Sequence, residues 1–204
     1  MSYEYDVFLS YNTQFPFGIW VRELLIPFLE PFIENTINRK VKIFHDRDGI
    51  LSGDSWPERL KNAIVHSRCM VAVWSPSYFN SEWCMKECAV MLNREKKLGY
   101  RTVSKPNGLI IPVCIFDGQH FPEFATKIHY RDCRDYARVG EGFKRTTRYI
   151  EFQDSLIEWV PDIVESIKGA PDWAKEWVTD EWLDNVISSI KEVEEYKFDK
   201  PSLG

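Results

Sequence analysis

The stretch CMVAVWSPSYFNSEWCMKEC, residues 69–88, decides the fold class. Its first six residues are almost entirely apolar, which is typical of a strand that is buried on both faces of a sheet. A short connection of serine, proline and asparagine follows, and Asn80 or Ser81 can then cap a helix that is expected to run to about Lys97. A buried strand that leads directly into a helix indicates a parallel sheet with helices on its faces.

Strand-length apolar runs and helical patterns alternate along most of the chain, which predicts an α/β fold with a central parallel sheet. The other predicted strands are residues 5–11, 41–45 and 109–115, with a weaker fifth strand at 127–130. The other predicted helices include residues 19–33, 55–64 and 146–167. Pro27 and Pro31 predict a kink or a break in the first of these helices. In sheets of this kind, ligand sites form at the carboxyl ends of the strands.

The bulk composition narrows the class of function. The chain has 204 residues, a formal net charge of -5 and a pI of about 5.5, which argues against general nucleic-acid binding because such proteins need clustered Lys and Arg. The short basic cluster of Lys144, Arg145 and Arg148 is interpreted as a solvated face. The N-terminus has no secretory signal pattern, and no apolar run approaches the ~20 residues that span a bilayer. We therefore expect a cytoplasmic protein that contacts neither nucleic acid nor membrane.

The five cysteines favour a reduced protein without a metal. Their number is odd and no CxxC motif occurs, so neither a disulfide framework nor a zinc ribbon is indicated. Cys84 and Cys88 lie four residues apart on a predicted helix and could share a metal ion, but no histidine is near them in the sequence. We therefore expect no metal site.

Two stretches at predicted strand ends carry candidate functional residues. Residues 44–56 form a long polar loop with two glycines and three aspartates, which exceeds what a simple strand-to-helix turn needs. Trp83 and Glu87 lie four residues apart at the start of a predicted helix and therefore share one of its faces. An aromatic ring beside a carboxylate suits a ligand with a flat ring and a ribose. The spacing alone is equally compatible with a Trp83 that packs in the core and a Glu87 that pairs with a lysine.

Four stretches, in order and correctly spaced, resemble the Toll/interleukin-1 receptor (TIR) domain family, in particular its bacterial NAD+-cleaving branch. They are residues 5–11, 46–56, 109–113 and the run from Ser75 to Glu87, with its Ser-Pro-Ser-Tyr and Ser-x-Trp-Cys-x-x-Glu motifs. The resemblance covers about residues 3–167 and implies a flavodoxin-like fold, with a central parallel five-stranded sheet flanked by helices. We therefore expect a TIR domain at residues 1–168. The break at Gly169–Pro171 predicts a C-terminal helical extension or linker at 169–204, which lies outside the usual family pattern. A helical pattern at residues 178–193 could pack back on the domain or dock a partner.

The resemblance also implies an enzyme, an NAD+ glycohydrolase that releases nicotinamide and forms ADP-ribose or a cyclic isomer. Glu87 takes the position of the catalytic glutamate, and no metal or cofactor is needed because NAD+ is the substrate. One carboxylate can suffice, since nicotinamide leaves without acid assistance and the oxocarbenium-like transition state needs only electrostatic stabilisation. The substrate-binding positions implied by the motifs are Ser10, Tyr11, Asn12, Asp46, Leu51, Ser52, Tyr78 and Trp83. Many catalytic members have a basic residue where this chain has Asn12, so the contacts made there differ from the family pattern.

The implied biological role is that of a bacterial immune, antiphage effector that is activated by oligomerisation. Its implied partners are NAD+, other TIR domains that bind through the Asp46–Trp56 loop, and a sensor domain or protein beyond the C-terminus. The alternative is a non-catalytic TIR–TIR adaptor module, which would have no need of Glu87. A nucleotide-sensing flavodoxin-like domain is disfavoured, because residues 12–16 after the first strand contain no glycine that could form a phosphate-binding loop.

Overall fold

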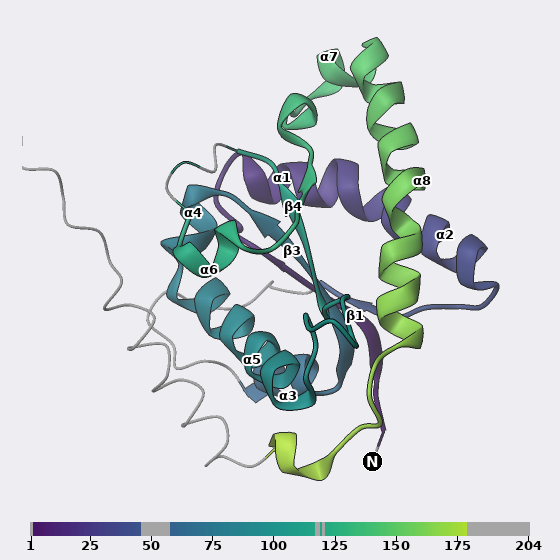
Figure 1. The fold of residues 1–204 in the computed structure, drawn as a ribbon. Coiled ribbons are helices and arrows are strands. Elements are labelled where there is room, and N and C mark those ends of the chain that lie inside the picture. The colour runs from purple at the N-terminus through teal and green to yellow at the C-terminus, as the bar shows by residue number, and fades with distance from the viewer. Residues whose placement is uncertain (1, 46–57, 117–118, 120, 179–204) are drawn as a thin grey trace, which may run out of the picture.

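A five-stranded sheet forms the centre of the protein in the computed structural model, which describes residues 2–45, 58–116, 119 and 121–178 (Figure 1). The strands are β1 (Tyr5–Tyr11), β2 (Ile43–Phe44), β3 (Ser67–Trp74), β4 (Ile110–Cys114) and β5 (Arg131–Asp132). Their order is β2-β1-β3-β4-β5 and every neighbouring pair is parallel. The predicted parallel α/β sheet is therefore confirmed. The position predicted for the fifth strand, residues 127–130, is wrong, because the chain pairs with β4 only at Arg131 and Asp132.

One face of the sheet is covered by the N-terminal helices and by the last long helix. These are α1 (Phe17–Trp20), the π-helical turn η1 (Val21–Leu25), α2 (Ile26–Ile37) and α8 (Thr147–Lys168). Val7, Leu9 and Tyr11 of β1 face this layer and share a core with apolar residues of α2 and α8. Instead of a break, the helix runs on from α1 through the π-helical turn into α2, with Pro27 as the second residue of α2 and Pro31 inside it.

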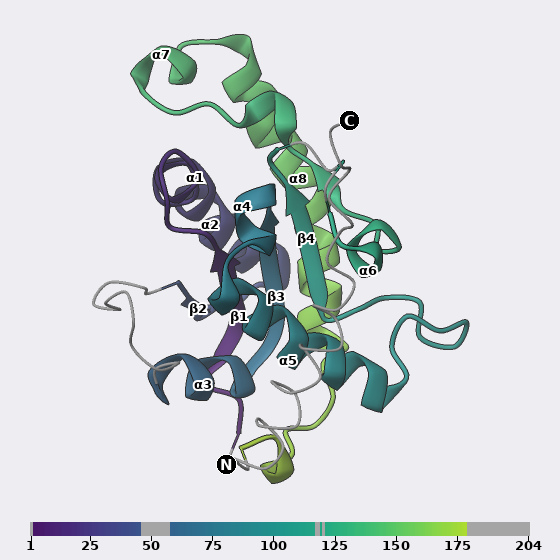
Figure 2. The same ribbon diagram turned by 90° about the vertical axis from the view of Figure 1, so that its left-hand side faces the viewer.

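The opposite face is covered by the helices that follow β2, β3 and β4 (Figure 2). They are α3 (Glu58–Val65), α4 (Pro76–Phe79), α5 (Glu82–Leu98) and α6 (Glu123–Thr126); the remaining short elements are η2 (Arg134–Tyr136), α7 (Glu141–Lys144) and η3 (Lys175–Val178). The Ser81 hydroxyl accepts a hydrogen bond from the Cys84 N–H, so the predicted cap of α5 is confirmed. Among the described residues, no helix is long and apolar enough to cross a membrane.

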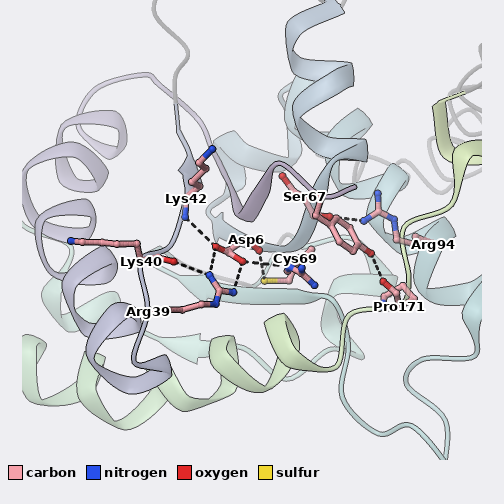
Figure 3. A network of polar contacts seen from close by, with 10 residues as sticks. Asp6, Arg39, Lys40, Lys42, Ser67, Cys69, Arg94 and Pro171 are labelled. Atoms are coloured by element: carbon pink, nitrogen blue, oxygen red, sulfur yellow. Dashed lines mark hydrogen bonds and ion pairs between the residues drawn. The ribbon is translucent and has the colours of Figure 1, made fainter. Parts of the chain in front are cut away.

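A polar network ties the strands together at the amino-terminal edge of the sheet (Figure 3). Asp6 accepts both guanidinium N–H groups of Arg39, at 2.7 and 2.9 Å, and the backbone N–H of Lys42 at 3.1 Å. On the α5 side, Arg94 donates to the backbone oxygen of Ser67 at 2.8 Å. Asp6 and Arg94 are buried, and they lie at the edge opposite to the strand ends where the sequence predicts a ligand site.

The segment after α8 packs along the same amino-terminal edge. The Tyr3 hydroxyl donates to the backbone oxygen of Pro171 at 2.7 Å. The Trp177 ring lies over the guanidinium of Arg94, 4.3 Å from its central carbon, and the Trp173 ring stacks on His66. Residues 170–178 therefore run back over α3 and α5, while the helical pattern predicted for residues 178–193 lies almost entirely outside the described residues.

Candidate functional site

The candidate site lies where the chain connections leave the sheet in opposite directions. From β1 the chain moves outward to β2, whereas from β3 it moves to β4 on the other side. In parallel sheets of this order, such a switch point leaves a crevice at the carboxyl ends of the two central strands. Ser10 and Tyr11 of β1 pair with Ala72 and Val73 of β3, so the last residues of both strands reach this edge together.

Glu87 is part of the buried stripe of α5. Cys84, Glu87, Cys88 and Met91 follow one another at helical spacing, and the three apolar members belong to the core beneath the helix. Glu87 itself is 0% exposed. A carboxylate at such a position costs free energy unless it is hydrogen-bonded, so packing alone does not account for a glutamate here. A glutamate at the surface paired with a lysine is also excluded by this burial.

Glu87 accepts a hydrogen bond from Ser10, which in turn contacts Tyr78, and the sequence predicted both of these residues as site residues. The Ser10 hydroxyl donates to Glu87 Oε2 at 2.5 Å, and Ser10 Oγ lies 2.9 Å from the Tyr78 hydroxyl oxygen. Ser10 and Tyr78 are both fully buried. Burial, with smaller contributions from Cys88, Cys84 and Glu87, raises the pKa of Tyr78 well above its ordinary value, so this hydroxyl keeps its proton. The structure thus brings Ser10, Tyr78 and Glu87 into one chain of hydrogen bonds.

Asn12 joins the two loops that border the switch point. Its Nδ2 donates to the backbone oxygen of Ser77 at 2.8 Å, and its Oδ1 accepts the N–H of Gln14 at 2.8 Å. The amide therefore serves as a bracket between the loop after β1 and helix α4. The sequence reasoning did not single out Ser77 or Gln14, because backbone partners leave no pattern in side-chain types.

The structure separates Tyr11 from the Glu87 cluster. Adjacent strand residues point to opposite faces, so Tyr11 lies in the core beneath α2 and α8, and its hydroxyl donates to the backbone oxygen of His45 at 3.3 Å. Trp83 is half-buried one turn before Glu87 and packs at the margin of the core on the α5 face, with the Lys86 ammonium 5.6 Å from its ring centroid. Trp83, the aromatic member of the predicted pair, therefore lies at the border between core and solvent.

Three predicted substrate-binding residues, Asp46, Leu51 and Ser52, lie outside the described residues. Within the described part of the chain, no group of three His, Cys, Asp or Glu side chains is placed to hold a metal ion. Cys84 and Cys88, the pair that could share a metal by spacing, are both buried in the core.

A family comparison agrees with this architecture. The model of the TIR domain family matches residues 7–147, which is more than half of the chain. This chain belongs to the TIR domain family. The match contains β1 from its third residue onward and the whole of β3, α4 and α5, and therefore includes Ser10, Tyr78 and Glu87.

Curated relatives of this TIR domain include one that is named as an NAD(+) hydrolase and one that is named as a probable cyclic ADP-ribose synthase. It is 28% identical over 110 residues to "NAD(+) hydrolase TirS" of Staphylococcus aureus, covering 54% of this chain and 34% of that protein. It is 32% identical over 77 residues to "Probable 2' cyclic ADP-D-ribose synthase BdTIR" of Brachypodium distachyon, covering 37% of this chain and 34% of that protein. The chain thus spans about a third of the length of these relatives. Among solved structures, the TIR domain of the Toll-related receptor TRR-2 from Hydra magnipapillata is 21% identical with a TM-score of 0.44, covering 74% of this chain and 98% of that one.

The site of this TIR domain is closed in the structure. Ser10, Tyr78 and Glu87 are all 0% exposed, so no ribose can touch the carboxylate in this conformation. The arrangement can hold an oriented carboxylate at the switch point, and its use on a substrate requires that the groups covering it move aside.

Proposed function

We propose that this TIR domain is an NAD+ glycohydrolase in which Glu87 stabilises the positive charge that develops on the nicotinamide-bearing ribose. The observation that supports this proposal best is the fully buried Glu87 carboxylate, hydrogen-bonded by Ser10 at the switch point of a β2-β1-β3-β4-β5 sheet. A buried carboxylate destabilises the fold in comparison with an apolar residue, and ionisable groups of this kind concentrate in functional sites. The names of the two relatives, an NAD+ hydrolase and a cyclic ADP-ribose synthase, support the same chemistry.

The proposed reaction begins with cleavage of the bond between nicotinamide and ribose. The electron pair of that bond leaves with nicotinamide, which departs as a neutral molecule, and the cationic ribosyl group is stabilised by the carboxylate. Water then adds to the ribosyl carbon and loses a proton to give ADP-ribose, or a nucleophilic atom of the same molecule adds to give a cyclic isomer. Trp83, half-buried at the rim one turn from Glu87, is proposed to wall the pocket against a flat ring.

The closed site leads us to propose that self-association or another partner opens it. A carboxylate with no exposed surface cannot act on a ribose until its cover has moved, and a change in conformation of this kind must be driven by differential binding to the open state. A second TIR domain is the proposed partner, in keeping with a role as an immune effector that becomes active on assembly. The enzyme is then expected to show turnover that rises more than proportionally with protein concentration.

The test is release of nicotinamide from NAD+, followed by chromatography, at dilute and concentrated protein. Glu87→Gln keeps the size of the side chain and removes its charge, and is expected to lower kcat by at least about 100-fold. Glu82→Gln is the matched control, because Glu82 is on the same helix but its side chain is 73% exposed and pairs with Lys86. It is expected to keep the wild-type rate.

Equal turnover by wild type and Glu87→Gln would remove the role given to Glu87. If neither protein released nicotinamide at any concentration, including a forced oligomer, the chain would act as a TIR–TIR adaptor module instead. The product ratio of ADP-ribose to cyclic isomer, read from the same chromatogram, distinguishes hydrolysis from cyclisation.

A further inference from the structure

Tyr78 is fully buried, yet it begins the hydrogen-bond chain that ends on Glu87. Its hydroxyl contacts Ser10 and reaches the carboxylate only through it, whereas its place in the sequence motif predicts a substrate-binding residue. We infer that Tyr78 is a positioning residue, which orients the Ser10 hydroxyl so that it donates its hydrogen bond to Glu87 Oε2. This inference rests on the proposed function and assigns a new role within the same site.

The direction of the chain follows from counting protons. A serine hydroxyl has one proton, and Ser10 uses it to donate to Glu87 Oε2 at 2.5 Å. In its 2.9 Å contact with Tyr78, Ser10 Oγ must therefore be the acceptor and Tyr78 the donor. A hydroxyl that accepts a hydrogen bond becomes a stronger donor, so the Tyr78 bond reinforces the one to the carboxylate.

The local fold holds Tyr78 rigidly in its role as donor. It is in the single-turn helix α4, whose cap, Ser75, accepts the Tyr78 backbone N–H at its hydroxyl oxygen. The ring is packed in the core on the α5 side of the sheet, edge-on to Phe79. Burial also raises the pKa of the Tyr78 hydroxyl, so it carries its proton throughout the pH range in which an enzyme works.

The benefit of such a chain is preorganisation. A carboxylate stabilises a developing cation best when it does not have to rotate or lose water as the charge forms. With Tyr78 in place, the Ser10 rotor and the Glu87 side chain are fixed before a substrate arrives. Without the Tyr78 hydroxyl, the Ser10 side chain can turn away from Glu87, and the carboxylate must be re-oriented in each turnover. Loss of Tyr78 should therefore lower kcat and leave the binding of NAD+ nearly unchanged.

The experiment is a double-mutant cycle with Tyr78→Phe, Ser10→Ala and the double variant, with kcat and KM for NAD+ measured for each. Tyr78→Phe is expected to lower kcat about tenfold with KM changed by less than about twofold. Ser10→Ala is expected to lower kcat by about tenfold to 100-fold, and the double variant should equal Ser10→Ala. Tyr3→Phe is the matched control, because it removes a tyrosine hydrogen bond of 2.7 Å at the far edge of the sheet, and it should keep wild-type kinetics.

The cycle separates a positioning role from a merely structural one. If Tyr78 only stabilised the fold, its loss would multiply with that of Ser10 instead of disappearing in the double variant. Wild-type kcat in Tyr78→Phe, or losses that multiply, would overturn the inference while an inactive Glu87→Gln still supported the proposed function. No turnover by the wild-type protein under any condition would overturn both. Should Tyr78→Phe fail to fold, 3-fluorotyrosine at position 78 makes the hydroxyl a stronger donor by replacing one ring hydrogen with fluorine, and an unchanged kcat would then overturn the inference.

Discussion

Arg94 offers a sharp test of how the helix that carries Glu87 is anchored. Its side chain is fully buried in α5, and it donates to three backbone oxygens, those of Ser67, Ile64 and Val65. Ile64 and Val65 are the last residues of α3, whose carbonyls have no partners within the helix. Arg94→Met keeps a long apolar stem of similar size but removes every donor, so the carbonyls remain buried without a partner.

The size of the effect can be worked out from these contacts. The Nη1 bond to Ser67 is 2.8 Å long and charge-assisted, and is worth about 2 kcal/mol net. The two bonds from Nη2, at 3.3 and 3.2 Å, are weaker and add about 0.5 kcal/mol each. The Trp177 ring, 4.3 Å from the guanidinium carbon, adds about 1 kcal/mol. Burial of the charge opposes these gains and lowers the pKa of Arg94 to about 10, so we expect a net loss of about 3 kcal/mol in Arg94→Met.

Urea unfolding followed by tryptophan fluorescence or circular dichroism measures this loss as a lower midpoint at an unchanged slope. Arg22→Met is the matched control, since Arg22 is exposed on η1 and its replacement should change the free energy of unfolding by less than about 0.5 kcal/mol. Arg94→Lys keeps the charge but not the fork of donors, and should lie between wild type and Arg94→Met. A loss below about 0.5 kcal/mol in Arg94→Met would refute the reasoning, because it would mean that these carbonyls need no partner.

Two further predictions concern the opposite ends of β1. Burial alone would raise the pKa of Asp6, but the hydrogen bond from Arg39, with smaller contributions, holds it below its ordinary value. Asp6→Asn should therefore lower the free energy of unfolding by about 2 kcal/mol at neutral pH. Because the pKa of Asp6 is lower in the folded state than in the unfolded state, this advantage of the wild type should be lost as pH falls below about 3.8. A difference between the two proteins in urea unfolding that persists at low pH would contradict the assignment. At the other end, a Cβ on Gly18 would lie 2.3 Å from the backbone oxygen of Thr13, so Gly18→Ala must shift the loop after β1 and should lower both the melting temperature and NAD+ turnover. Gly142→Ala, where a Cβ meets nothing within 4 Å, is its control, and equal behaviour of the two would show that the loop adapts freely.

Most of the fold could be predicted because buried strands have a strong signature. The first strand was predicted at its observed bounds, Tyr5–Tyr11, and the third and fourth within two residues, since both are apolar on their two faces. β5 contains only Arg131 and Asp132, which have no apolar pattern, and it is recognised only from its pairing with β4. The π-helical turn at Val21–Leu25 likewise could not be predicted, because no residue type in the sequence indicates it.

The candidate site was predictable in its members but only partly in its geometry. Helical spacing placed Glu87 on one face with Trp83, and a strand end placed Ser10 at the same edge of the sheet. The alternation of side chains along β1 could have shown that Ser10 and Tyr11 point to opposite faces, and it separates Tyr11 from the glutamate. The direction of the Tyr78 hydroxyl depends on the turn of α4 and could not be predicted from the position of Tyr78 in the sequence.

The helix α5 has three buried acidic or basic residues, and the sequence alone does not show which of them serves a functional site. Glu87, Arg94 and Glu95 are all buried, and by composition each could serve a site or the fold. Glu95 accepts the backbone N–H groups of Leu109 and Ile110 as well as the Arg101 side chain, and Arg94 donates to backbone oxygens. These two thus bond mainly to main-chain groups at the start of β4 and at the junction of α3 with β3, which need such partners whatever the protein does. Glu87 instead meets the hydroxyl of Ser10, a side chain that an apolar residue could replace at no cost to the backbone hydrogen bonds. A buried carboxylate that accepts a hydrogen bond from a side chain with no part in the backbone hydrogen bonds is the one that we expect function to have retained.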